Sequence, residues 1–120
     1  MTASDVIGRT DALFPNVFPF PMKVRWLLEL DKRINSELLS LYGAGAELSQ
    51  EEETSHGREL LLGEEQADLY IGYLTMKMEL HSGNITGYVN CASLFNSAYL
   101  SFMQFYNRTH KARETKINID

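Results

Sequence analysis

The sequence predicts an all-α fold, a small bundle of about four helices with a long C-terminal helical hairpin and one long mobile loop. Apolar residues recur at intervals of three and four along most of the chain, which is the spacing of one helix face. Prolines and glycines fall between these periodic segments and mark their ends. The chain has 120 residues, 44% of them hydrophobic, which suits one domain with its own core. We expect a single helical domain over residues 1–110 and a flexible C-terminal tail over 111–120.

The first helix is predicted over residues 1–14, with Ser4 as its N-terminal cap. Three prolines follow within seven residues, and none suits a helix interior. Residues 15–21 are therefore predicted to be an extended connection. Its apolar side chains are expected to pack onto the domain: Val17, Phe18 and Phe20.

A second helix is predicted from Pro21 to about Tyr42. Proline is favoured in the first helical turn, and the glycines Gly43 and Gly45 are typical of a helix end. The helical spacing is carried by Val24, Leu27, Leu28, Ile34, Leu38 and Leu41.

Residues 43–63 have the weakest helical pattern, and we expect them to form a mobile acidic loop. From Glu47 to Glu65 there are seven glutamates and one basic residue, Arg58. A loop of about 20 residues is uncommon in a compact domain and is usually functional. A short strand over residues 59–62 is an alternative for its last part.

A helical hairpin is predicted after this loop. The third helix begins near Glu64 and ends at His81, with acidic residues in its first turn that suit the positive end of the helix dipole. Gly83 can adopt the left-handed conformation that ends a helix, and Asn84 can cap the next one. Because the link is so short, the third and fourth helices must lie antiparallel, and the second packs across them.

The fourth helix is predicted to be the longest, from about Ile85 to Thr109, and no charged residue occurs from Ile85 to Asn107. One face has apolar residues with a heptad-like spacing. Another face has small residues at four-residue intervals, which either let a second helix approach closely or simply face water. The heptad-like seam is Ile85, Tyr88, Ala92, Phe95, Tyr99, Phe102 and Tyr106, and the small row is Ser93, Ser97 and Ser101.

The charge of the chain is negative but uneven. A net charge of −5 argues against bulk nucleic-acid binding, which needs a basic surface. The segment from Arg108 to Lys116 is nevertheless basic, opposite in sign to the loop, so one copy can attract another. The alternative is that both segments are solvated surface. The candidate partner or oligomer contacts are Glu51, Glu52 and Glu53 of the loop, Ser93, Ser97 and Ser101 of the small row, and Arg108, His110, Lys111, Arg113 and Lys116.

No motif in the sequence indicates catalysis or metal binding. His56, His81 and His110 lack the spacing of zinc-protease and di-iron sites. Cys91 has no second cysteine with which to build a thiolate site or an internal disulfide. Neither a phosphate-binding glycine motif nor a nucleophile-elbow sequence occurs. We therefore expect a protein that is not an enzyme, needs no cofactor or metal, and has neither a signal peptide nor a membrane-spanning segment.

Several blocks of the chain, spread over most of residues 1–110, together resemble a known family. The chain is similar to the small proteins encoded beside the major capsid gene in tailed phages and prophages of Gram-positive hosts, described as head–tail connector or adaptor proteins. The blocks that carry this resemblance are Lys23–Ile34, Asp68–Leu74, Glu79–His81, Tyr88–Asn90, Ala92–Tyr99 and Phe105–His110.

The resemblance implies a structural virion protein that forms a ring of about a dozen copies under the portal protein and extends the DNA channel. Its partners would be copies of itself, the portal protein and the next tail-side connector protein, with DNA only passing through. Residues 108–120 would reach a partner, and the acidic loop would meet a neighbour or line the channel, where negative charge repels DNA phosphates. The implied location is the virion neck, and the host cytoplasm during assembly.

Two other function classes remain as alternatives. A small helical phage regulator or DNA-binding protein would need a basic recognition helix, whereas the longest helix is uncharged over most of its length. An enzyme would need an acid–base or metal constellation, and the sequence offers no motif for one.

Overall fold

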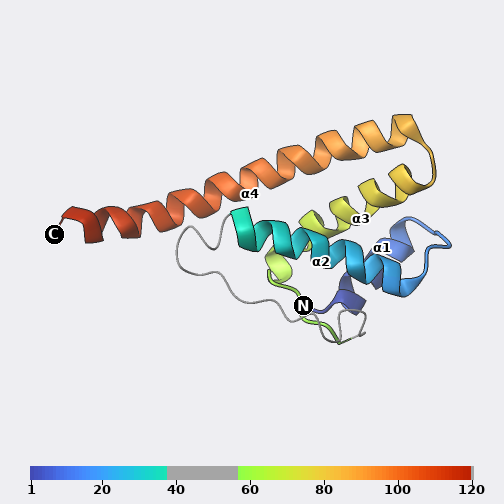
Figure 1. The fold of residues 1–120 in the computed structure, drawn as a ribbon, viewed down its shortest axis with the longest axis horizontal. Coiled ribbons are helices and arrows are strands. Elements are labelled where there is room, and N and C mark those ends of the chain that lie inside the picture. Colours follow the sequence, from blue (N-terminus) through green and yellow to red (C-terminus); the bar gives the residue numbers. More distant parts are fainter. Residues whose placement is uncertain (38–56, 120) are drawn as a thin grey trace.

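The computed structural model describes residues 1–37 and 57–119, with the side chains of the last helix as far as Thr109. These residues form four α-helices and one 3-10 turn (Figure 1). The all-α prediction is confirmed. In place of a strand over residues 59–62, these ranges hold one isolated bridge between Thr2 and Glu59. The elements are α1 (Ala3–Leu13), α2 (Phe20–Glu37), η2 (Glu64–Gln66), α3 (Ala67–His81) and α4 (Ile85–Ile119).

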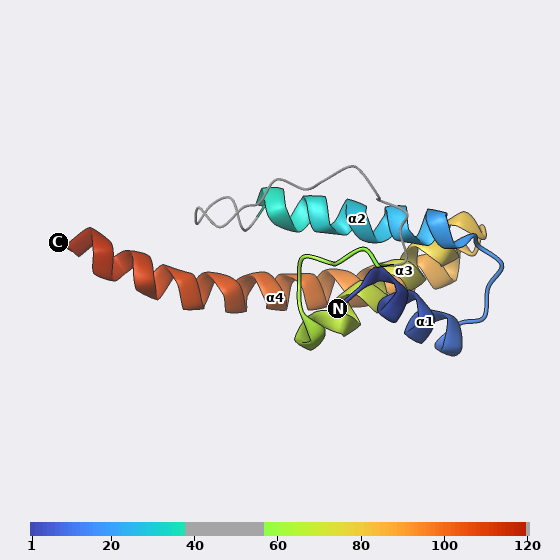
Figure 2. The same cartoon turned by 90° about the horizontal axis from the view of Figure 1, so that it is seen from below.

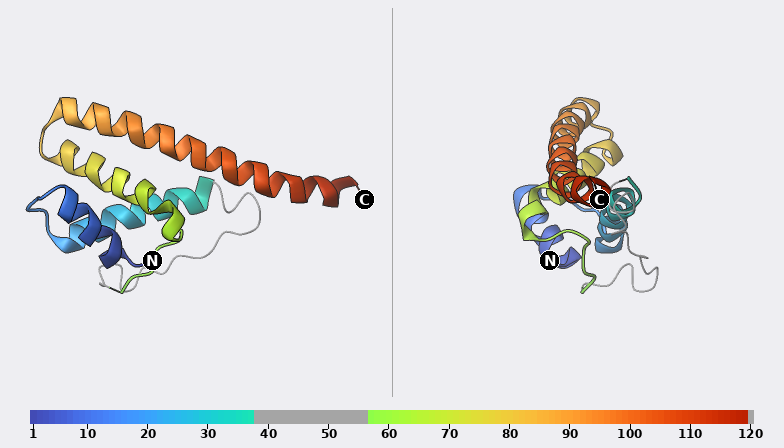
Figure 3. Two further views of the ribbon diagram at one scale, coloured as in Figure 1. Left: turned by 180° about the vertical axis from the view of Figure 1, so that it is seen from behind. Right: turned by 90° about the vertical axis from the view of Figure 1, so that its left-hand side faces the viewer.

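Helix α3 lies at the centre of the bundle and packs against α1, α2 and α4. The predicted hairpin is present, because α3 and α4 run antiparallel through a short link (Figures 1 and 3). Since α3 has 15 residues and α4 has 35, α3 covers less than half of its partner's length. Figures 1 and 2 show the second half of α4 projecting past the other helices. The largest fully buried side chains are Tyr70, Phe95, Leu27, Leu30, Ile34 and Leu74.

The start of α1 differs from the prediction. Thr2, not Ser4, is the cap: its Oγ1 accepts a hydrogen bond from the Asp5 backbone N–H at 3.2 Å. The Asp5 carboxylate in turn accepts from the Thr2 N–H at 3.0 Å, which completes a capping box. The prediction overlooked the acidic residue three positions after Thr2.

The ends of α2 and α4 differ from the prediction as well. Helix α2 begins at Phe20, one residue before Pro21. We expected the last helix to end near Thr109 and a flexible tail over 111–120, but α4 continues to Ile119 because no proline or glycine interrupts it. The expected end of the second helix at Tyr42 and the loop residues Glu51, Glu52 and Glu53 lie outside the described residues.

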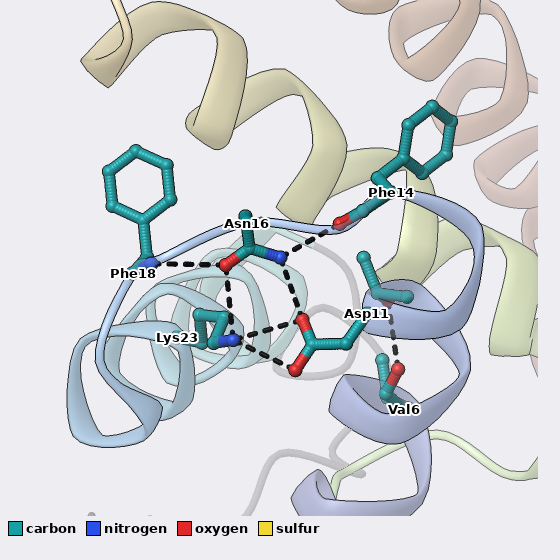
Figure 4. Close-up of polar contacts among 7 residues, drawn as sticks. Val6, Asp11, Phe14, Asn16, Phe18 and Lys23 are labelled. Atoms are coloured by element: carbon teal, nitrogen blue, oxygen red, sulfur yellow. Dashed lines mark hydrogen bonds and ion pairs between the residues drawn. The ribbon is translucent and has the colours of Figure 1, made fainter.

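A buried lysine holds the link between α1 and α2 (Figure 4). Lys23 Nζ donates to both carboxylate oxygens of Asp11 at 2.9 Å and to Asn16 Oδ1 at 3.2 Å. Asn16 donates to Asp11 and to the Phe14 carbonyl, and it accepts from the Phe18 N–H. Phe18 packs edge-on against Trp26 as expected, whereas Val17 is 98% exposed, contrary to expectation. The polar network therefore holds this link in place, and only some of the link's apolar side chains pack onto the bundle.

A second buried network attaches residues 57–63 to the bundle. Asp31, on α2, accepts from the Tyr70 hydroxyl at 2.5 Å and from the Leu61 N–H at 3.0 Å. The same hydroxyl accepts from the Leu62 N–H at 2.9 Å. Burial raises the pKa of Asp31, although these hydrogen bonds oppose the shift. Two helices and the described part of the loop therefore meet at one carboxylate.

Candidate assembly surface on the last helix

The turn between α3 and α4 sets the direction of the last helix. Gly83 has φ +80°, and its N–H donates to the Leu80 carbonyl at 3.2 Å. The Asn84 N–H donates to the Glu79 carbonyl at 3.1 Å, which completes a Schellman cap. Asn84 Oδ1 then accepts from the Gly87 N–H at 3.0 Å and caps α4. The predicted roles of Gly83 and Asn84 are confirmed.

The inner face of α4 is aromatic. Phe95 and Tyr99 are buried and stack on each other, and Phe95 also contacts the Tyr73 ring of α3. Tyr88, Ala92, Phe102 and Tyr106 are half-buried on the same side. This confirms most of the predicted seam, but Ile85 is exposed because it lies at the edge of the hairpin.

The end of α2 contacts this aromatic face. The Tyr99 hydroxyl donates to Glu37 Oε1 at 2.8 Å, and the Arg33 guanidinium lies 4.3 Å from the centre of the Tyr99 ring. The hydrogen bond from Tyr99 lowers the pKa of Glu37, and burial raises the pKa of Tyr99. The α2 side of α4 therefore has charged partners.

The outer surface of α4 is uncharged from Ile85 to Asn107 and mixes polar side chains with large apolar ones. Its first 23 residues, from Ile85 to Asn107, include no charged side chain. Solvated helix faces usually carry charged residues, so a long exposed face without them, with several large apolar side chains among its polar ones, suits an interaction surface. The exposed large apolar residues of α4, which we call the outer apolar set, are Ile85, Val89, Leu94, Leu100 and Phe105.

One part of this surface forms a groove between the end of α1, helix α3 and helix α4. Its volume is about 280 Å³, and its walls include Phe14 and Leu94, which are 47% and 73% exposed. Burial raises the pKa of the Cys91 thiol in this groove. We call it the α3–α4 groove, and it is lined by Phe14, Asp68, Ile71, Gly72, Thr75, Cys91 and Leu94.

The predicted contact residues are only partly placed. Ser93, Ser97 and Ser101 are exposed on α4, and Arg108 is exposed further along it. His110, Lys111, Arg113 and Lys116 belong to the projecting part of the same helix, and their side chains are outside the described part. The last part of the acidic segment is placed: Glu59, Glu64 and Glu65 are exposed, Glu59 pairs with the N-terminal amine, and Glu64 pairs with Arg9.

The α3–α4 groove was missed from the sequence. Phe14, Gly72 and Leu94 come from three elements, and no spacing rule connects them. The one available signal was Gly72, a glycine inside a predicted helix, which often has a packing or functional reason.

Comparisons with known protein families, with curated proteins and with solved structures find no match to this chain. Within residues 1–37 and 57–119, no group of three or more histidine, cysteine, aspartate or glutamate side chains is arranged to hold a metal ion. Over the same ranges, no helix has both the length and the hydropathy needed to cross a bilayer.

Proposed function

We propose that this protein is a structural subunit of a tailed-phage head–tail connector, which assembles as a ring under the portal and extends the DNA channel. The observation that carries the proposal is the outer surface of α4, where five large apolar side chains are exposed and 23 consecutive residues carry no charge. Covering such a surface with protein removes apolar area from water and stabilises assembly.

The shape of the chain supports a ring better than a symmetric pair. A ring uses head-to-tail contacts, so each subunit needs two different and complementary surfaces. The projecting end of α4 is basic, and the start of α3 is acidic, with Glu65 and Asp68 exposed. Opposite charges at two separate places on one chain suit a contact of this kind.

The proposed partners are copies of the chain itself, the portal protein and the next tail-side connector protein, in the virion neck and, during assembly, in the host cytoplasm. DNA passes through the ring without specific binding. An overall charge of −5 supports this role, because a negative channel wall repels phosphates and lets the duplex move.

The test is native mass spectrometry and light scattering of the full chain, alone and mixed with the portal protein of the same phage. We expect one ring-sized complex that contains several copies of this chain on the portal. A monomer that does not bind the portal contradicts the proposal. Tight binding to a DNA duplex at low salt would favour the DNA-binding alternative instead.

A further inference from the structure

We infer that the α3–α4 groove receives the basic, projecting end of α4 from a second copy of the chain. The inference rests on the proposed function as an assembling subunit and names the two surfaces that meet. The occupant is residues 108–119, and the receiving surface is the groove together with its acidic end.

The groove is apolar, and close packing within the fold does not require the glycine that lines it. Gly72 lies in its lining, and a Cβ added there would have Phe95 Cδ1 as its nearest neighbour, at 3.9 Å. That distance is an ordinary van der Waals contact, so close packing does not explain the glycine. Glycine weakens a helix interior relative to alanine, so its presence here costs stability and leaves the groove open.

One end of the groove is acidic. Asp68 lies one turn before Ile71 on α3 and is exposed, and Glu65 lies exposed in η2 just before it. Acidic residues at a helix start are already favoured by the helix dipole. A partner that brings positive charge to this place gains a further electrostatic attraction, mostly as faster and more specific association.

The projecting end of α4 has the complementary chemistry. Residues 108–116 have four basic residues and one acidic residue, and isoleucines follow at 117 and 119. Figures 1 and 2 show that this end extends away from the acidic start of α3 in its own chain. A second copy can therefore reach the groove with a segment that its own bundle does not cover.

The contact repeats from copy to copy because groove and helix end are different surfaces of the same chain. Each copy offers one groove and one helix end, so the contact produces rings or open filaments and does not stop at a dimer. This distinguishes it from a symmetric pairing of two outer apolar sets.

Cys91 makes the test direct, since it is the sole cysteine and lies in the groove. A second cysteine is introduced by Ala112→Cys in the projecting part of α4, and the full chain is treated with a short bis-maleimide, alone and with the portal protein. We expect a ladder of covalent trimers and larger species. The matched control introduces the second cysteine as Lys32→Cys, on the exposed side of α2, and is expected to give no ladder.

A second pair of variants needs no chemical linkage. Leu94→Gln and Leu80→Gln both change an exposed leucine, but only Leu94 lines the groove and belongs to the outer apolar set. We expect Leu94→Gln to raise the concentration at which half of the chain assembles by at least about tenfold, and Leu80→Gln to leave it within about twofold. Light scattering gives both midpoints, and circular dichroism checks that the variants stay folded.

The outcomes separate this contact from the proposed function. If the chain assembles on the portal, three results would overturn the groove contact and leave the connector proposal intact. These are a ladder only with Lys32→Cys, covalent dimers only, or equal effects of the two leucine variants. Linkage of the Ala112→Cys thiol to the portal instead of Cys91 overturns it too. A ladder without portal binding supports the groove contact and contradicts the connector proposal, and absence of all assembly contradicts both.

Discussion

At the residue scale, two charged side chains in the core hold non-helical parts of the chain. Lys23 is 4% exposed and Asp31 is 2% exposed, and a charge in such a place is costly unless it is paired or hydrogen-bonded. Lys23 pairs with Asp11, and Asp31 accepts hydrogen bonds from Tyr70 and Leu61. In the described part of the chain, every buried side-chain nitrogen and oxygen has a partner. Removal of one partner would leave the other buried without compensation.

Asp31 predicts a pH dependence of stability. Burial raises its pKa in the folded protein above the value in the unfolded chain, which is about 3.9. Protonated Asp31 therefore favours folding, and this contribution is complete below about pH 4 and is lost as the pH rises through the raised folded pKa. We expect the free energy of unfolding of the natural chain to fall relative to that of Asp31→Asn as the pH rises from about 4. Urea unfolding of both proteins across pH measures the difference, and parallel curves would contradict it.

At the element scale, α3 is the central helix of the bundle and also lines the α3–α4 groove through Gly72. Two glycines, one within α3 and one just after it, differ in whether their backbone conformation suits a residue with a Cβ. Gly72 lies inside α3 with room for a Cβ, whereas Gly83 follows α3 with φ +80°, a conformation that costs other residues energy.

Alanine at these two glycines is expected to have opposite effects. Gly72→Ala should raise the free energy of unfolding by about 1 kcal/mol, because alanine is the better helix former. Gly83→Ala should lower it by about 1 kcal/mol, because the left-handed position is strained for any residue with a Cβ. Denaturant unfolding of the two variants measures both changes. A loss of stability in Gly72→Ala would mean that the Phe95 contact is tighter than its 3.9 Å distance indicates.

At the scale of the whole molecule, a compact bundle and a projecting helix meet in one chain. The molecule is 55 Å along its longest axis and 19 Å along its shortest. A helix of 35 residues is about 52 Å long at 1.5 Å per residue, so α4 alone accounts for the long axis. Its basic end and the acidic start of α3 give this elongated molecule an uneven charge.

The charge distribution predicts a salt-sensitive assembly. The double change Arg108→Glu with Lys111→Glu should weaken self-assembly at low salt, since it places negative charge opposite an acidic surface. The control, Arg25→Glu with Lys32→Glu, alters the same number of charges on the exposed side of α2. We expect the difference between the assembly midpoints of the two double variants to become smaller from 0.1 M to 1 M salt, because the screening length falls from about 10 to about 3 Å. Light scattering across salt concentrations measures it, and equal midpoints at 0.1 M would rule out the basic end as a contact.

The helices, their order and the hairpin link follow from local chemistry, so they could be predicted before the fold was known. Helical spacing and the residues at 83 and 84 act over one or two turns, so the Gly83 and Asn84 caps were predictable. The start of α1 was misplaced by two residues, because Thr2 and Ser4 are chemically alike and only the position of Asp5 distinguishes them. The absence of charge from Ile85 to Asn107 was also evident from the sequence.

The apolar side chains of α4 that remain uncovered can be identified only in the folded chain. Phe95 and Leu94 are neighbours in the sequence, yet Phe95 packs on Tyr73 and Leu94 is mostly exposed. Burial depends on what lies opposite a side chain, and the short α3 covers one side and one half of the long α4. The groove with Gly72 and the buried carboxylate of Asp31 have the same origin, because each arises where three separate parts of the chain meet. Packing between elements determines these two sites, so no sequence pattern within a single element indicates them.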